Sequence, residues 1–160
     1  MKKLLILFLA FTLTACNDGD FDVPDFEFTE KVNMCGEFVL YISNTKSIEV
    51  LVLTLPKTAL GTTPSVSLPI SNAVTITYRI FDKGITSTYF CQAVPPSEPK
   101  IIKELIADGG TINIVTTEIL ADNIVTGHSY EITVSKLSFN DKKERIYYEN
   151  FYFGKLDVKN

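Results

Sequence analysis

The sequence contains no tryptophan, a single histidine (His128) and only three cysteines among its 160 residues. One histidine leaves little material for an imidazole-based active site or for zinc, which takes four ligands. The absence of tryptophan weakens any interpretation that depends on aromatic stacking against sugars. The chain is net acidic, at −4, and has no basic cluster. Because nucleic acid attracts proteins through such clusters, it is not an expected partner.

A transmembrane helix is also missing from the sequence pattern. The longest apolar run, Leu4–Leu13, is interrupted only by Thr12 and is shorter than the roughly 20 residues that span a bilayer. It follows the basic pair Lys2 and Lys3 and leads into small residues before Cys16. This layout predicts a secretory signal over residues 1–15.

The junction Leu13-Thr14-Ala15-Cys16 resembles the lipobox of bacterial lipoproteins, with all four positions matching. The resemblance implies that Cys16 carries a diacylglycerol, that cleavage occurs just before it, and that its amine is acylated with a fatty acid such as palmitate. Two or more acyl chains anchor a protein stably. The alternative is an ordinary signal peptide followed by a chance cysteine.

After cleavage, 145 residues would remain with 13 basic and 19 acidic side chains, a net charge of −6. The lipidated Cys16 and residues 17–31 are predicted to form an acidic tether, since six carboxylates precede the first cation, Lys31. Such a segment repels itself and stays extended. Its C-terminal part, which includes Phe26 and Phe28, can dock on the domain as an edge strand. Residues 32–160 are predicted to form a single β domain.

Several short segments resemble small lipoproteins of flavobacteria and their relatives, most of them of unknown function. The resemblance rests on the lipobox and on four segments of the mature chain: 18–22, Cys35-Gly36, 109–112 and 151–154. It implies an outer-membrane location. In that group, acidic residues soon after the lipidated cysteine act as a surface-export signal, and Asp18 and Asp20 match this pattern. The alternative is a lipoprotein on the periplasmic face.

Cys35 and Cys91 are predicted to form a disulfide, because an even pair in an oxidising compartment is typical of one. Closing this loop of 57 residues would stabilise the chain by about 4 kcal/mol in the chain-entropy model. Two buried free thiols, or a metal site, are the alternatives. A metal is disfavoured because one histidine and two distant cysteines lack ligand spacing.

About eight strands separated by turn residues predict an all-β fold, an antiparallel β-sandwich of immunoglobulin-like or similar type, with a barrel as the alternative. Ile48–Leu55 is almost continuously apolar, as expected for a central strand. Residues 56–72 contain several prolines and predict a long connection, and Ile85–Cys91 is expected as a strand. Asp108-Gly109-Gly110 is expected to form a hairpin turn.

Three groups of polar residues are candidates for active or metal sites. His128 with Ser129 or Ser135 and Asp122 lacks a nucleophile elbow. Asp18, Asp20 and Asp22 fit the start of a calcium loop but lack its glycine and terminal glutamate. Glycoside hydrolysis needs two carboxyl groups held roughly 5 to 10 Å apart. A cross-strand pair drawn from Glu131, Glu144 and Glu149 is the remaining enzymatic candidate.

The aromatic run 147–153 suggests a binding face instead, with Tyr148 and Tyr152 on one side of a strand. The sequence therefore predicts a membrane-anchored, non-catalytic binding or structural module with a protein or glycan ligand, and no cofactor or metal. A carboxylate-dependent hydrolase acting on envelope or extracellular glycans is the alternative.

Overall fold

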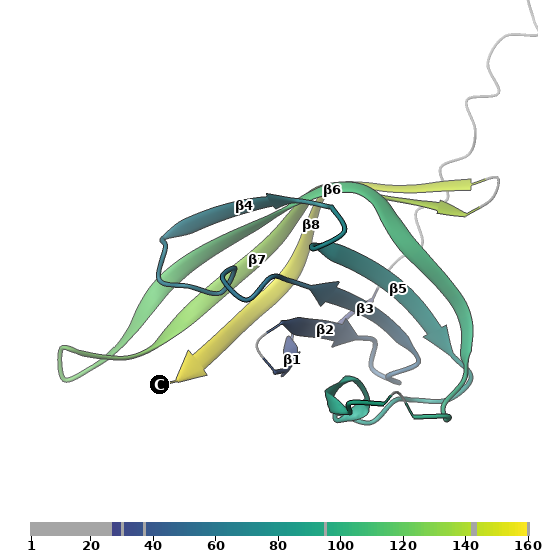
Figure 1. Cartoon of the computed structure of the whole chain (residues 1–160), viewed down its shortest axis with the longest axis horizontal. Helices are drawn as coiled ribbons and strands as arrows, with labels where there is room; N and C mark the ends of the chain where they lie inside the picture. The colour runs from purple at the N-terminus through teal and green to yellow at the C-terminus, as the bar shows by residue number, and fades with distance from the viewer. Residues whose placement is uncertain (1–26, 30, 37, 95, 142–143, 160) are drawn as a thin grey trace, which may run out of the picture.

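The computed structural model describes residues 27–29, 31–36, 38–94, 96–141 and 144–159. The predicted signal, Cys16 and the pair Asp18 and Asp20 lie outside the described residues. The described chain forms one antiparallel sheet in the order β1-β2-β3-β5-β6-β7-β8, with β4 added beside β6 (Figure 1). The strands are β1 (Asn33–Cys35), β2 (Val39–Ser43), β3 (Glu49–Thr54), β4 (Ser65–Pro69), β5 (Thr75–Phe81), β6 (Ile101–Ala121), β7 (Ile124–Asp141) and β8 (Glu144–Lys159). The prediction of an all-β antiparallel fold is confirmed.

The sheet curls into a half-barrel, and the predicted two-layer sandwich is not confirmed. The three long strands β6, β7 and β8 curve along their length (Figure 1). They continue from one side of the curl to the other, so the protein has one curved layer where a sandwich would have two stacked sheets. Strand twist accumulates along such lengths. A parallel bridge between Lys31 and Lys155 also places the segment before β1 beside β8, across the open side of the curl.

The bend in β6 lies at Gly109 and Gly110, where the pairing with β7 shifts register. Gly110 has φ 139°, and a Cβ on Gly109 would come within 2.8 Å of the Ser138 Oγ. The prediction of a hairpin turn here is wrong, because β7 pairs with the chain on both sides of the two glycines. The turn between β6 and β7 lies instead at Asp122 and Asn123, both with positive φ, as a two-residue hairpin requires.

Two further predictions need correction. The segment 56–72 contains β4, which pairs with β6 alone and so lies at an edge, where flanking prolines are tolerated. Ile85–Cys91 is not a strand. It lies within a loop over residues 82–100, whose described part contains one 3₁₀ turn, η2 (Tyr89–Cys91), because Cys91 is held against β1 rather than beside β5.

The sheet buries apolar side chains on both faces, as predicted for the central strand β3. Leu51 and Leu53 enter the main core inside the curl, whereas Val50 and Val52 pack on the outer face. The outer cluster is covered by the 82–100 loop and consists of Cys35, Tyr41, Val50, Val52, Phe81, Ile85 and Tyr89. The largest fully buried side chains of the main core include Phe139, Phe153, Leu40, Ile76, Ile112 and Ile132.

Candidate functional site

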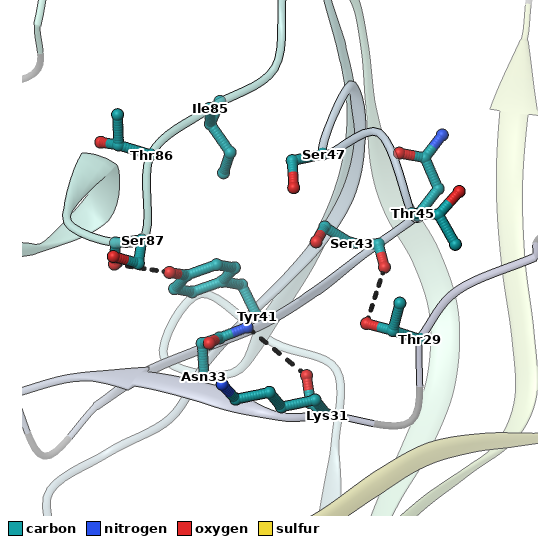
Figure 2. Close-up of a pocket in the computed structure, with 11 residues that line it drawn as sticks. Thr29, Lys31, Asn33, Tyr41, Ser43, Thr45, Ser47, Ile85, Thr86 and Ser87 are labelled. Atoms are coloured by element: carbon teal, nitrogen blue, oxygen red, sulfur yellow. Dashed lines mark hydrogen bonds between the residues drawn. The ribbon is translucent and has the colours of Figure 1, made fainter.

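A polar pocket of about 240 Å³ lies on the outer side of β2, between three segments that are far apart in the sequence (Figure 2). The first segment is the arm before and within β1, the second is the turn between β2 and β3, and the third is the start of the 82–100 loop. The lining residues are Thr29, Lys31, Asn33, Tyr41, Ser43, Asn44, Thr45, Ser47, Ile85, Thr86 and Ser87.

The arm is attached to the domain by backbone and side-chain bonds. The Thr29 amide and hydroxyl both donate to the Ser43 carbonyl, at 2.9 and 3.0 Å. The preceding Phe28 packs edge-on against Phe151, with ring centroids 6.3 Å apart. Phe28 and Thr29, at the described end of the predicted tether, therefore contact the domain, but through an isolated bridge between Phe28 and Asn44 and not as an edge strand.

The turn between β2 and β3 is shaped by Asn44. Its side-chain oxygen accepts from the amides of Ile48 and Glu49, at 3.0 and 3.4 Å. Its backbone carbonyl accepts from the Ser47 amide at 2.9 Å, and Ser47 has φ 55°. Asparagine is favoured in turns because its short side chain replaces a backbone acceptor. The turn therefore presents its hydroxyls on a fixed backbone.

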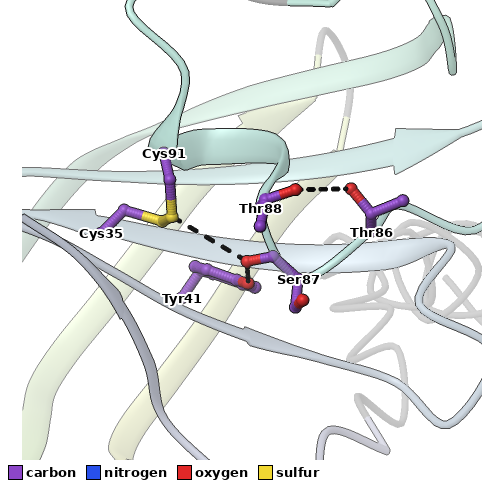
Figure 3. The surroundings of a disulfide bond; sticks show 6 residues. All are labelled: Cys35, Tyr41, Thr86, Ser87, Thr88 and Cys91. Atoms are coloured by element: carbon purple, nitrogen blue, oxygen red, sulfur yellow. Dashed lines mark hydrogen bonds between the residues drawn. A yellow bond between two sulfur atoms is a disulfide. The ribbon is translucent and has the colours of Figure 1, made fainter.

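The third segment, the start of the 82–100 loop, forms the third wall of the pocket. It is attached by the predicted disulfide, which joins Cys35 of β1 to Cys91 of η2 with a Cα–Cα distance of 4.8 Å (Figure 3). The loop is also bound at Ile85, whose amide donates to the Ser47 carbonyl at 2.9 Å. The Tyr41 hydroxyl donates to the Ser87 carbonyl at 2.6 Å. Burial raises the pKa of Tyr41, so the phenol remains protonated and keeps this bond at neutral pH.

The pocket offers hydroxyls, two side-chain amides and one ammonium, with Ile85 as its only aliphatic lining residue. Among the described residues that line it there is no carboxylate, imidazole or thiol, so these residues can bind and orient a polar molecule but supply no general base. Ligand pockets typically enclose about 300–1,000 Å³ and are mostly apolar. This smaller, polar pocket suits a compact hydrophilic ligand.

A second hollow of about 370 Å³ shares Asn44 and Thr45 with the first and is otherwise lined by Glu27, Lys46, Ile48 and Glu49. The Tyr78 hydroxyl donates to the Glu49 carboxylate at 3.0 Å, at the edge of the main core. Burial and this hydrogen bond raise the pKa of Tyr78 well above its ordinary value of 10. The bond therefore stabilises the sheet at neutral pH.

The structure does not bring Tyr148 and Tyr152 together on one exposed face. Tyr148 pairs with the buried Leu137 and packs against the main core. Tyr152 pairs with Thr133 and is 46% exposed. The alternation of core-facing side chains changes phase in both strands: in β7 between Val134 and Leu137, around Lys136 with φ 56°, and in the paired part of β8 between Tyr148 and Phe151.

The predicted acid and histidine sites are also not assembled. Glu131 pairs with Lys155, whereas Glu149 lies beside Asn150, whose partner is Ser135. Glu131 and Glu149 are therefore offset by about five residues along the strands, about 16 Å at 3.3 Å each, more than a glycosidase pair allows. Glu144 pairs with Asp141 at the far end of the β7–β8 ladder, so it lies a similar distance from Glu149 along β8 and farther still from Glu131.

His128 pairs with Glu118 and Val158. The neighbouring Ser129 donates to Asp157 at 2.6 Å instead of to the histidine. Asp122 lies at the hairpin tip. A nucleophile, base and orienting acid are therefore not within reach of one another here.

Comparison with protein-family models, with curated proteins and with solved structures finds no match to this chain. Among the described residues, no three His, Cys, Asp or Glu side chains come close enough to hold a metal ion. The described part of the chain likewise contains no helix with the length and apolar character needed to cross a membrane. The fold and the pocket are therefore the basis for a functional assignment.

Sequence reasoning did not identify Tyr41, Thr86 or Ser87 as site residues. The available signal was the clustering of hydroxyl residues in two short segments, 43–47 and 86–88, which follow Cys35 and precede Cys91. A bond between the two cysteines brings the chain around Cys91 to β1 and so allows these two segments to lie near each other.

Proposed function

We propose that the protein is a lipid-anchored outer-membrane protein whose half-barrel domain binds a small hydrophilic ligand and does not catalyse its conversion. The observation that supports binding most directly is the pocket beside β2. Its three walls are fixed by backbone pairing at Thr29, by the Asn44 turn and by the Cys35–Cys91 disulfide. A pocket with fixed polar groups loses little conformational freedom when a ligand enters.

The lining chemistry supports a binding role over a catalytic one. Hydroxyl and amide groups provide hydrogen bonds for recognition, but none of the lining side chains is an evident nucleophile paired with a base. Carboxylates in the neighbouring hollow face the other side of the turn, where Glu49 accepts from Tyr78. The proposed ligand is therefore bound and released unchanged.

The test is a titration of the ¹⁵N-labelled mature chain in detergent with neutral sugars, sugar acids and amino acids. At least one class should shift the amides of 43–47 and 86–87. Tyr41→Phe removes the hydroxyl that donates to Ser87 and should weaken binding several-fold. Tyr152→Phe makes the same chemical change outside the pocket and should not. Shifts confined to another surface, or no shifts with any class, would refute the pocket as the site.

The anchor and the surface location are proposed from the sequence, on Cys16, Asp18 and Asp20. Cys16→Ala should release the protein from membranes and remove the acyl mass from its N-terminus. Protease added to intact cells should remove the wild-type domain, and Asp18→Ala combined with Asp20→Ala should protect it. Digestion only after the outer membrane is opened would place the domain on the periplasmic face instead.

A further inference from the structure

Lys31 is the only charged residue among those that line the pocket. The ion pairs formed among the described residues use Arg79, Lys83, Lys100 and Lys103, and none uses Lys31. No described carboxylate therefore pairs with its ammonium group, which is exposed to solvent. A lysine that has no carboxylate beside it among the described lining residues favours an anion over a neutral molecule.

The backbone from which the Lys31 side chain extends is held by bonds before, at and after this residue. Thr29 bonds to Ser43, and Lys31 itself forms the parallel bridge to Lys155. The Lys31 carbonyl also accepts from the Asn33 side-chain amide at 3.4 Å. The side chain lies along the edge of the pocket beside Asn33 (Figure 2). An anion at this edge would share the pocket with the hydroxyls of the other two walls.

A simple inorganic anion would not use the remainder of the pocket. Hydroxyls of the turn and of Thr86 and Ser87 line the walls opposite the arm, in a volume of about 240 Å³. Tyr41 donates to Ser87, so the lone pairs of its oxygen are left to accept from a ligand hydroxyl. These groups are complementary to a molecule that carries several hydroxyls of its own.

A single ammonium group also limits the charge of the ligand. Phosphate groups are typically held by arginine forks, helix N-termini or several cations, whereas a carboxylate with one negative charge matches one lysine. We propose that the pocket binds a sugar acid, with its carboxylate at Lys31 and its ring hydroxyls on the Tyr41, Thr86 and Ser87 side. This inference rests on the proposed function, since it specifies the ligand of the same pocket.

The experiment compares three probes that separate charge from hydroxyls: glucuronate, glucose and acetate. Each is titrated into the mature chain in detergent, with amide shifts of 43–47 and 86–87 as the readout. Glucuronate should bind at least tenfold more tightly than either of the other probes. Its affinity should fall as salt is raised, because the exposed ion pair is screened.

Lys31→Gln should weaken glucuronate binding about tenfold and leave glucose binding unchanged, so that the two sugars become equal. Lys57→Gln is the matched control, since Lys57 lies over Phe38, outside the pocket. Neither change removes a buried side chain, because both lysines are exposed.

Three outcomes would overturn the inference. Equal binding of glucose and glucuronate by the wild type would leave the pocket as a sugar site without a role for Lys31, so the proposed function would survive. Equal binding of acetate and glucuronate would show that the site recognises only the negative charge and not the ring hydroxyls. Tight binding of other polar compounds in the panel, with none of the three probes bound, would keep the pocket as a binding site but exclude the sugar acid.

Discussion

Removal of the Cys35–Cys91 bond should destabilise the domain strongly without unfolding it at room temperature. The bond joins residues 56 apart, and the chain-entropy model gives about 4 kcal/mol for a loop of that length. The loop would still be held at its base, where the Asp82 amide donates to the Lys100 carbonyl and the Lys100 amide to the Asp82 carboxylate. The main core lies on the other face of the sheet and keeps its packing.

The measurement is urea unfolding of a Cys35→Ala/Cys91→Ala variant of the mature chain, followed by circular dichroism. With a slope near 2 kcal/mol per molar urea, a loss of about 4 kcal/mol lowers the midpoint by about 2 M. Reductant should lower the wild-type midpoint by a similar amount and leave the variant unaffected. A shift below about 0.5 M in both comparisons would refute the idea that this bond restrains the unfolded chain.

Three further predictions concern the sheet itself. Gly127→Ala should lower the free energy of unfolding by more than about 2 kcal/mol, because a Cβ there would collide with the backbone of β8. Gly61→Ala is the control and should be nearly neutral, because its Cβ would make only an ordinary contact at 3.5 Å. Phe139→Ala should cost about 3–5 kcal/mol by leaving a cavity in the main core, and a cost below 1 kcal/mol would contradict its full burial. Burial and the hydrogen bond to Glu49 raise the pKa of Tyr78, so the unfolded state loses this proton first and the free energy of unfolding falls as pH rises above about 10. Tyr78→Phe should therefore lose less stability at alkaline pH than the wild type does. An identical loss of stability in the two proteins would contradict this assignment.

The sequence predicted secondary structure and burial best in strands with a regular pattern of apolar and polar residues. Val74, Ile76, Tyr78 and Ile80 alternate with polar residues, and this segment forms β5. The continuous apolar run of β3 correctly indicated burial on both faces. Both patterns depend on which side of a strand faces a core, which is a local property that the sequence carries directly.

The errors arose where tertiary pairing overrides a local signal. Asp108-Gly109-Gly110 has the composition of a hairpin turn, yet continuous pairing with β7 makes it a bend within one strand. The core-facing side of β7 changes around Lys136, which has a positive φ, and a lysine at that position gives no sign of this change in the sequence. The half-barrel follows from such bends in long strands, so a count of strands could not distinguish it from a sandwich.

The pocket was missed for a related reason. Its walls come from the arm at Thr29, the turn at Asn44 and the loop at Thr86, and only tertiary contacts bring them together. Each wall is held by a different kind of bond: backbone pairing, a side-chain acceptor in a turn, and a disulfide. Because the disulfide fixes the wall that carries Thr86 and Ser87, its loss should weaken ligand binding as well as stability. A variant without the bond that bound its ligand with wild-type affinity while folded would show that this wall does not shape the site.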